Sequence, residues 1–219
     1  MNSEFCFTIG VPGSSWSMLS HRLKIHLDQD LTDVDGNRVQ SIQELKPHRG
    51  EDEKGHFGSY FGPYNEFGEN FHDIPNNYTL ESFYDECRKP FLGTDKTKNI
   101  RCHWFSYNLD WLWDNCKGNT MFLIYRDTEN SLKWWRKRGG WSIQHPVYTW
   151  YKDDATMEER ITEENRLILD FAERKNLEWN IYDENWWFTE FGRHERTLIN
   201  RPTPKKVEEE IKVIFTSIV

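Results

Sequence analysis

The sequence has few cysteines, no basic excess and no long hydrophobic run. Its four cysteines form no C-x-x-C pair, which argues against a zinc site or a disulfide framework and favours reduced, buried thiols. A formal net charge of −8 argues against a dedicated nucleic-acid-binding protein. The densest apolar run, residues 121–125, is far too short to span a membrane, and the N-terminus has no basic leader. We therefore expect a cytoplasmic protein that binds neither nucleic acid nor membrane.

The composition is that of a globular chain. Hydrophobic residues make up 37% of the sequence and aromatic residues 16%, enough to bury a sizeable core. No repeat or linker divides the chain, so we predict a single α/β domain over residues 1–219. Glycine alternates with aromatic residues over about 48–98, where only Leu80–Arg88 has a helical pattern. A loop region of this length usually serves as a lid or binding surface, and we predict an insertion there.

Two patterns resemble metal sites only weakly. Residues 33–44 place acidic and amide side chains as in a calcium loop, but Arg38 stands where the loop requires glycine, which favours a plain turn. His48, His56 and His72 fit no compact ligand motif and are predicted to be loop histidines. We predict no metal site.

Hydrophobic periodicity predicts alternating strands and helices. Strands are expected at Phe5–Ile9, 99–104, Thr120–Tyr125 and 177–182. Helices are expected from Trp16 onward, over Leu80–Arg88, 131–138 and 157–174, and after Pro204, where Val207, Ile211, Ile214 and Phe215 would share one face. Since Thr120–Tyr125 is apolar on both faces, it suits the centre of a parallel sheet. This order predicts a three-layer αβα fold with a mainly parallel central sheet and a binding crevice at the carboxyl ends of its strands.

The first strand, turn and helix form a candidate anion site. A glycine-bearing turn, residues 10–15, joins the strand Phe5–Ile9 to the helix that starts near Trp16. The N–H groups and the dipole at a helix start favour negative charge, so a P-loop-like βα turn can bind phosphate. An ordinary βα turn is the alternative.

Two segments resemble PAPS-dependent sulfotransferases. Arg101-Cys102-His103 stands where that family has Lys-Thr-His at a strand end, and the apolar strand that follows ends in Arg126, before a helix with Ser131 and an aromatic pair. The opening loop, Pro12-Gly13-Ser14-Ser15-Trp16, is similar to the family's Pro-Lys-Ser-Gly-Thr-Thr-Trp loop but lacks its lysine.

The resemblance implies transfer of a sulfuryl group from PAPS to a hydroxyl acceptor, a carbohydrate or small molecule. His103 would be the general base, with Arg101 as a nearby cation in place of the missing lysine. Arg126, with Ser131 as its hydroxyl partner, would hold the 3′-phosphate. The phosphosulfate would lie against the turn and the helix start, formed by Pro12, Gly13, Ser14, Ser15, Trp16 and Ser17.

Two other classes of function remain open. A P-loop kinase or NTPase would need a lysine in the turn, and none occurs between Gly10 and Ser20. A non-catalytic module on the same fold could instead grip a sugar or peptide with the aromatic segment over 48–98.

Overall fold

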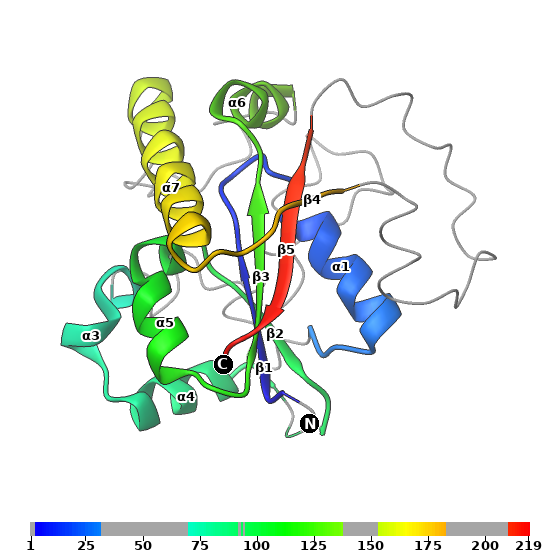
Figure 1. Cartoon of the computed structure of the whole chain (residues 1–219), viewed down its shortest axis with the longest axis vertical. Helices are drawn as coiled ribbons and strands as arrows, with labels where there is room; N and C mark the ends of the chain where they lie inside the picture. The colour runs from blue at the N-terminus through cyan, green and yellow to red at the C-terminus, as the bar shows by residue number, and fades with distance from the viewer. Residues whose placement is uncertain (1–2, 32–69, 92, 94, 138–152, 183–209) are drawn as a thin grey trace.

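A computed structural model describes residues 3–31, 70–91, 93, 95–137, 153–182 and 210–219. These residues form a mixed α/β fold around one open sheet in the order β2-β1-β3-β5-β4 (Figure 1). Its strands are β1 (Phe5–Ile9), β2 (Lys98–Arg101), β3 (Thr120–Tyr125), β4 (Asn180–Ile181) and β5 (Lys212–Ser217). The helices are α1 (Trp16–Leu27), α3 (Ile74–Asn77), α4 (Leu80–Arg88), α5 (Leu109–Asn115), α6 (Thr128–Lys137) and α7 (Asp154–Arg174), with 3₁₀ turns η2 (Asn70–Asp73) and η3 (His103–Asn108).

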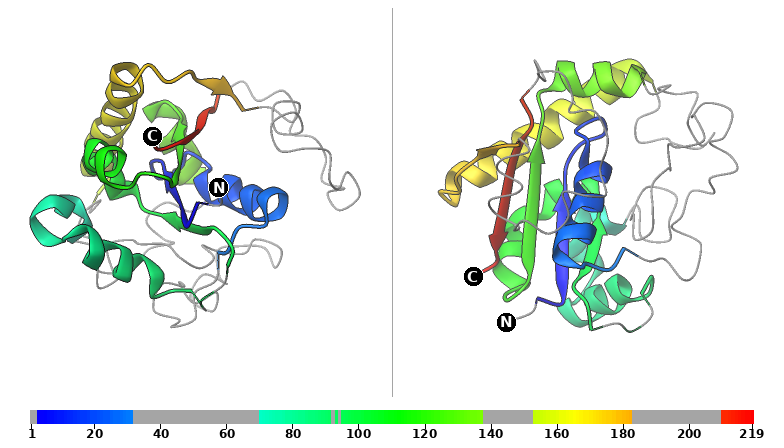
Figure 2. Two further views of the ribbon diagram at one scale, coloured as in Figure 1. Left: turned by 60° about the horizontal axis from the view of Figure 1, so that its bottom comes forward. Right: turned by 90° about the vertical axis from the view of Figure 1, so that its right-hand side faces the viewer.

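The centre of the sheet is parallel, as predicted. β1 lies between β2 and β3 and runs parallel to both, so that Thr8 is in register with Arg101 on one side and Phe122 on the other. β5 is antiparallel to β3, and the two-residue β4 pairs with β5 at the edge. The carboxyl ends of β1, β2 and β3 therefore meet at one edge, and α6 lies across that edge (Figure 2).

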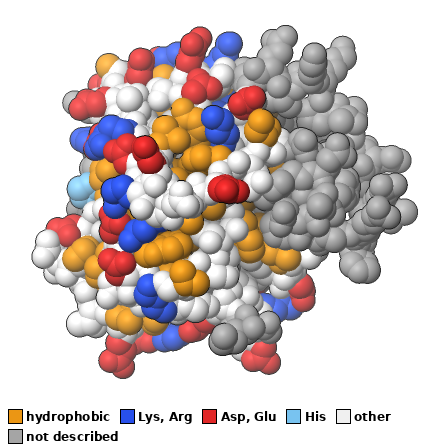
Figure 3. Space-filling view, viewed as in Figure 1, with side chains coloured by type: hydrophobic (Ala, Val, Ile, Leu, Met, Phe, Trp, Pro, Cys, Tyr) orange, Lys and Arg blue, Asp and Glu red, His pale blue; other side chains and the backbone are white. Residues whose placement is uncertain are grey.

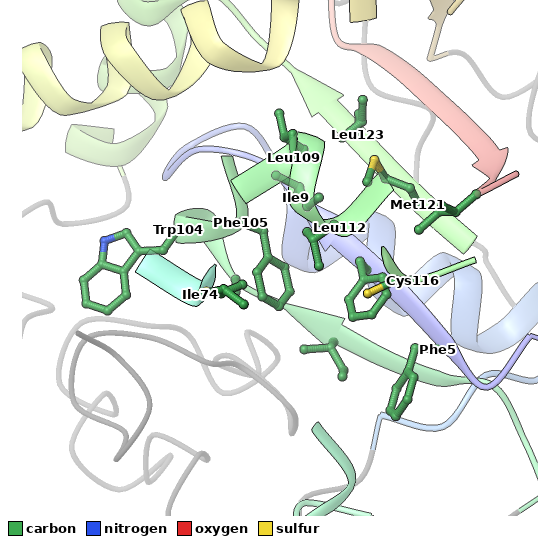
Figure 4. Close-up of a cluster of buried hydrophobic side chains, with 14 of the residues drawn as sticks. Phe5, Ile9, Ile74, Trp104, Phe105, Leu109, Leu112, Cys116, Met121 and Leu123 are labelled. Carbon is green, nitrogen blue, oxygen red and sulfur yellow. The ribbon is translucent and has the colours of Figure 1, made fainter. Parts of the chain in front are cut away.

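Two apolar clusters flank the sheet because neighbouring residues of a strand point to opposite faces. Phe5, Phe7 and Ile9 pack with side chains of α4, η3, α5 and α7, and Figure 4 shows part of this cluster. On the other face, Cys6 and Phe122 pack with Leu19 and Leu23 of α1. All five residues of β1 are buried, which explains its continuous apolar sequence.

The predictions for β1, α1, α4, β3, α6 and α7 are confirmed, whereas the predicted C-terminal helix is wrong. Residues 212–217 form strand β5 along β3 instead. The run of β-branched and aromatic side chains in Lys212–Ser217 suits a strand. The apolar residues there also have helical spacing, but the hydrogen bonds to β3 favour the strand. The predicted late strand is limited to Asn180–Ile181.

The predicted insertion at 48–98 is described only from residue 70 onward. There α4 is the helix that was predicted over Leu80–Arg88, while η2 and α3 are helical turns that were not predicted. Asn108 ties this segment to the core, since its amide donates to the Phe71 carbonyl over 2.7 Å and its Oδ1 accepts from Ile74 N–H. The calcium-like segment 33–44, His48 and His56 lie outside the described residues.

The four cysteines are free and buried, as predicted. Burial raises the pKa of every thiol, and that of Cys6 and Cys116 to about 12. Within the described ranges, no group of three or more His, Cys, Asp or Glu side chains could hold a metal, and no helix is long and apolar enough to cross a bilayer. On the face shown in Figure 3, acidic and basic side chains interleave.

Candidate functional site

The carboxyl edge of the parallel strands gathers the predicted site residues. The turn 10–15 follows β1, His103 follows β2, and Arg126 follows β3. The chain leaves β1 toward α1 on one face and leaves β2 toward η3 and α5 on the other. Where neighbouring connections diverge in this way, an α/β sheet has a natural place for a ligand.

The turn after β1 is tight and strained. Ser14 N–H donates to the Val11 carbonyl over 3.1 Å, and Gly13 and Ser15 adopt positive φ of 81° and 69°. Ser15 is the N-cap of α1, yet its side chain makes no capping hydrogen bond, and the first turn of the helix has no acidic residue. A non-glycine residue with positive φ is uncommon and marks a backbone held by its surroundings. The turn therefore presents a helix start that favours an anion.

Arg126 braces this turn from β3. Its Nη1 donates to the Gly13 carbonyl over 2.9 Å, and its guanidinium lies 5.5 Å from the ring centroid of Trp134. The Arg126 carbonyl accepts hydrogen bonds from Ser131 Oγ at 3.1 Å and Asn165 Nδ2 at 2.8 Å. Ser131, predicted as the hydroxyl partner of Arg126, therefore bonds to the main-chain carbonyl of that residue.

His103 lies just beyond β2 and pairs with a residue of α7. Its Nδ1 is 3.3 Å from Glu164 Oε1, and both side chains are fully buried. The ring of Trp16, the first residue of α1, meets the imidazole edge-on with centroids 6.3 Å apart. The turn after β1 and the histidine after β2 are therefore in one place, as predicted.

Further polar groups surround the His103–Glu164 pair. His72 of η2 lies against Tyr107 of η3, with ring centroids 4.6 Å apart. Burial lowers the pKa of His72, and the charge of Arg160 on α7 acts in the same direction. Burial also raises the pKa of the Tyr107 hydroxyl, and the Glu164 carboxylate adds to that shift.

Arg101 is also buried, as the last residue of β2. Strand alternation puts it on the same face as Asn99, whose amide donates to Gln29 Oε1 just after α1. Arg101 therefore lies on the face of the sheet that α1 covers, and α1 is the helix that follows the turn 10–15. The predicted strand 99–104 ends at this residue, and Cys102 leads into η3.

Sequence reasoning missed Glu164. It lies between Ile161 and Ile168 on the buried stripe of α7, where the periodicity calls for an apolar residue. An acidic residue at such a position is a signal in itself, because a buried carboxylate requires a partner. Its partner, His103, is far away in sequence, so the pairing could not be read from the pattern.

No family model matches the chain, and comparison with curated proteins and with solved structures found no match. The function proposed next therefore depends on the residues of the site itself.

Proposed function

We propose that this chain is a sulfotransferase that moves a sulfuryl group from PAPS to a hydroxyl acceptor. The observation that carries the proposal is that an anion-favouring turn, a histidine and an arginine, each following a different strand, meet at one edge of the sheet. We also propose the finer fold that goes with it, a three-layer αβα domain with a P-loop-like first turn, and a carbohydrate or small-molecule acceptor.

Each group has a task in this reaction. Backbone N–H groups of the turn 10–15 and of the start of α1, together with the hydroxyls of Ser14 and Ser15, hold the 5′-phosphosulfate. Arg126 binds the 3′-phosphate. A guanidinium has five N–H donors, so this residue can keep its bond to Gly13 and hold an anion as well. Arg101 supplies positive charge near the leaving oxygen.

His103 takes the proton of the acceptor hydroxyl as that oxygen attacks sulfur. The bond from sulfur to the phosphate oxygen breaks, and 3′-phosphoadenosine 5′-phosphate leaves with the electron pair. Since the imidazole is fully buried, the acceptor must displace the side chains that cover it before transfer. Such enclosure keeps water from competing with the acceptor.

Thermal unfolding with the bisphosphate product tests the donor site. A ligand at 100 times its Kd adds about 2.7 kcal/mol. For a chain of this size we expect the Tm to rise by roughly 5–10 °C. AMP, which lacks the 3′-phosphate, should shift the Tm far less. A shift with ATP and magnesium instead would favour a kinase or NTPase, and no shift with any nucleotide would favour a non-catalytic module.

A transfer assay tests the base. His103→Ala should lower kcat by roughly 10²–10⁴ while the bisphosphate still raises the Tm, because His103 acts on the acceptor and not on the donor. Unchanged turnover would remove His103 from the mechanism.

A further inference from the structure

The strongest feature that the reaction above does not use is the buried carboxylate of Glu164. We propose that Glu164 is a positioning residue that fixes the tautomer of His103 and stabilises its protonated form during transfer. The inference deepens the proposed sulfotransferase function and depends on it for the identity of the reaction.

The geometry indicates which nitrogen of the His103 ring carries the proton and which accepts one. Glu164 Oε1 is 3.3 Å from His103 Nδ1, and an ionised carboxylate can only accept a hydrogen bond. Nδ1 therefore carries the proton in the neutral ring. Nε2 is then the nitrogen with the lone pair, the one that can accept a proton from a hydroxyl.

A purely structural role explains this pair poorly. Both side chains are fully buried, and an ion pair in the interior seldom stabilises a fold more than apolar side chains of similar volume. Ile161 and Ile168 lie on the same stripe of α7, so an apolar residue would fit the helix pattern at 164. A carboxylate that orients a histidine and balances its charge does explain the choice.

The same turn of α7 also holds Arg126. Asn165, the next residue, donates from Nδ2 to the Arg126 carbonyl over 2.8 Å. Consecutive residues of one helix therefore fix the base and the backbone of the residue assigned to the 3′-phosphate. This shared support keeps the distance between donor and base constant.

Several charged or titratable groups face the pair from the elements packed around it. They are His72 of η2, Cys102 before η3, Tyr107 of η3 and Arg160 of α7. Arg160 is one turn before Glu164 on the same helix, and its charge opposes the effect of Glu164 on the pKa of His72 and of Tyr107.

Glu164 acts while the sulfuryl group is transferred. The acceptor oxygen forms its bond to sulfur, its proton moves to His103 Nε2, and the phosphate oxygen of the donor leaves with the electron pair. The imidazolium so formed keeps its Nδ1–H bond to Glu164, whose negative charge compensates the new positive charge.

Nitrogen NMR of the imidazole ring tests the contact without any substrate. With the His103 signal identified by its loss in His103→Ala, the wild-type protein should show the tautomer protonated at Nδ1. A ring protonated at Nε2 instead would overturn the proposal. Because this reading needs neither donor nor acceptor, it is independent of whether the chain is a sulfotransferase.

Kinetics of Glu164→Gln test the role. The amide keeps the size of the side chain but not its charge, so we expect kcat to fall by roughly 10²–10⁴ with little change in the acceptor KM. The pH dependence of kcat should change as well, since the neutral amide cannot balance the charge of the imidazolium formed during transfer. Glu163→Gln is the matched control. This neighbouring carboxylate pairs with Arg166 at 2.8 Å on the surface, and its loss should leave rate and profile unchanged.

The bisphosphate Tm shift, measured on each variant, separates the possible failures. A Glu164→Gln protein that keeps the shift is folded with an intact donor site, so an unchanged kcat and pH profile in it would refute the positioning role. If this variant does not fold, Glu164→Asp takes its place, since it keeps the charge but moves it back from Nδ1, and it should lose rate in the same way. A wild-type protein without the shift would defeat the sulfotransferase assignment, while the tautomer reading would still decide the His103–Glu164 contact.

Discussion

Replacing Gly13 with alanine should lower the stability of the protein strongly, although it adds only one methyl group. Its φ is +81°, and a Cβ added there would lie 2.0 Å from the Ser131 carbonyl oxygen and 2.8 Å from its carbonyl carbon. Both atoms belong to the backbone of α6 and cannot move aside as a flexible side chain could. Gly13→Ala must therefore displace either the turn or the helix.

The expected cost has two parts. An L-residue in the left-handed region costs about 1–2 kcal/mol. Forcing a methyl group against a packed backbone adds about 1–3 kcal/mol. Displacing the turn would also lengthen the hydrogen bond from Arg126 Nη1 to the Gly13 carbonyl. We expect the free energy of unfolding to fall by about 2–5 kcal/mol in total.

Gly118 provides a matched control. Its φ is +80°, almost the same as at Gly13, but nothing lies within 4 Å of a Cβ added there. Gly118→Ala should therefore show the conformational cost alone, about 1–2 kcal/mol. Denaturant unfolding of both variants isolates the contact between the turn and α6, which should be worth about 1–3 kcal/mol, or roughly 2–12 °C in Tm.

The outcome also bears on function. If the turn holds the donor, Gly13→Ala should lose most of the bisphosphate Tm shift while Gly118→Ala keeps it. Equal stability losses in the two variants would show that the turn does not press on α6, and the geometry of the site as described would be wrong.

Three further results are expected. Asn119→Ala should cost about 1–3 kcal/mol in urea unfolding, because Phe5 N–H, 2.9 Å from Asn119 Oδ1, and the Tyr84 hydroxyl lose their buried partner; a loss near zero would contradict this. The four buried thiols should not react with an aromatic disulfide reagent in the native protein, and all four should react in guanidinium; a rapidly reacting thiol in the native protein would refute their burial. The Arg88 guanidinium lowers the pKa of Glu4 through a hydrogen bond, so the stability from this partly exposed pair is present above pH 4.5 and is lost as the pH falls through the lowered value. Wild type and Arg88→Ala should differ slightly at neutral pH and converge in acid; a constant difference would argue against the pair.

Local patterns predicted much of the fold. Strand β1, the turn and α1 follow from an apolar run, a glycine and helical spacing, all within Phe5 to Leu23. Helix α7 follows from the apolar stripe over 157–174, and the structure starts it a few residues earlier, after the N-cap Asp153, whose carboxylate accepts from Thr156 N–H at 2.8 Å. Each of these signals acts over a few residues, so the sequence alone shows it.

The errors occur where a distant partner decides the structure. β5 has a pattern compatible with a helix, but β3 needs a neighbour on its outer edge, and Phe122 pairs with Phe215 there. The helical turns η2 and α3 were not predicted, and Asn108, beyond β2, anchors them through Phe71 and Ile74. No window of the sequence contains both members of such a pair.

The candidate site divides in the same way. The turn, His103 and Arg126 could be proposed from sequence because each follows a strand, and parallel strands bring their carboxyl ends together. The residues that hold His103 and Arg126 in place could not be predicted, since Glu164 and Asn165 belong to a helix that follows much later in the chain.

The turn 10–15 has no lysine, but the fold brings an arginine to it. In sequence, Gly13 without a neighbouring lysine leaves the turn without a cation. In the fold, the Arg126 guanidinium reaches the turn from β3 and donates to the carbonyl of that same glycine. This arginine both holds the turn and places positive charge beside it. The close approach of Gly13 to Ser131, which no larger residue permits, keeps the turn within reach of Arg126. Gly13 and Arg126 therefore depend on each other, and a change at either residue should disturb the proposed anion site by displacing the other.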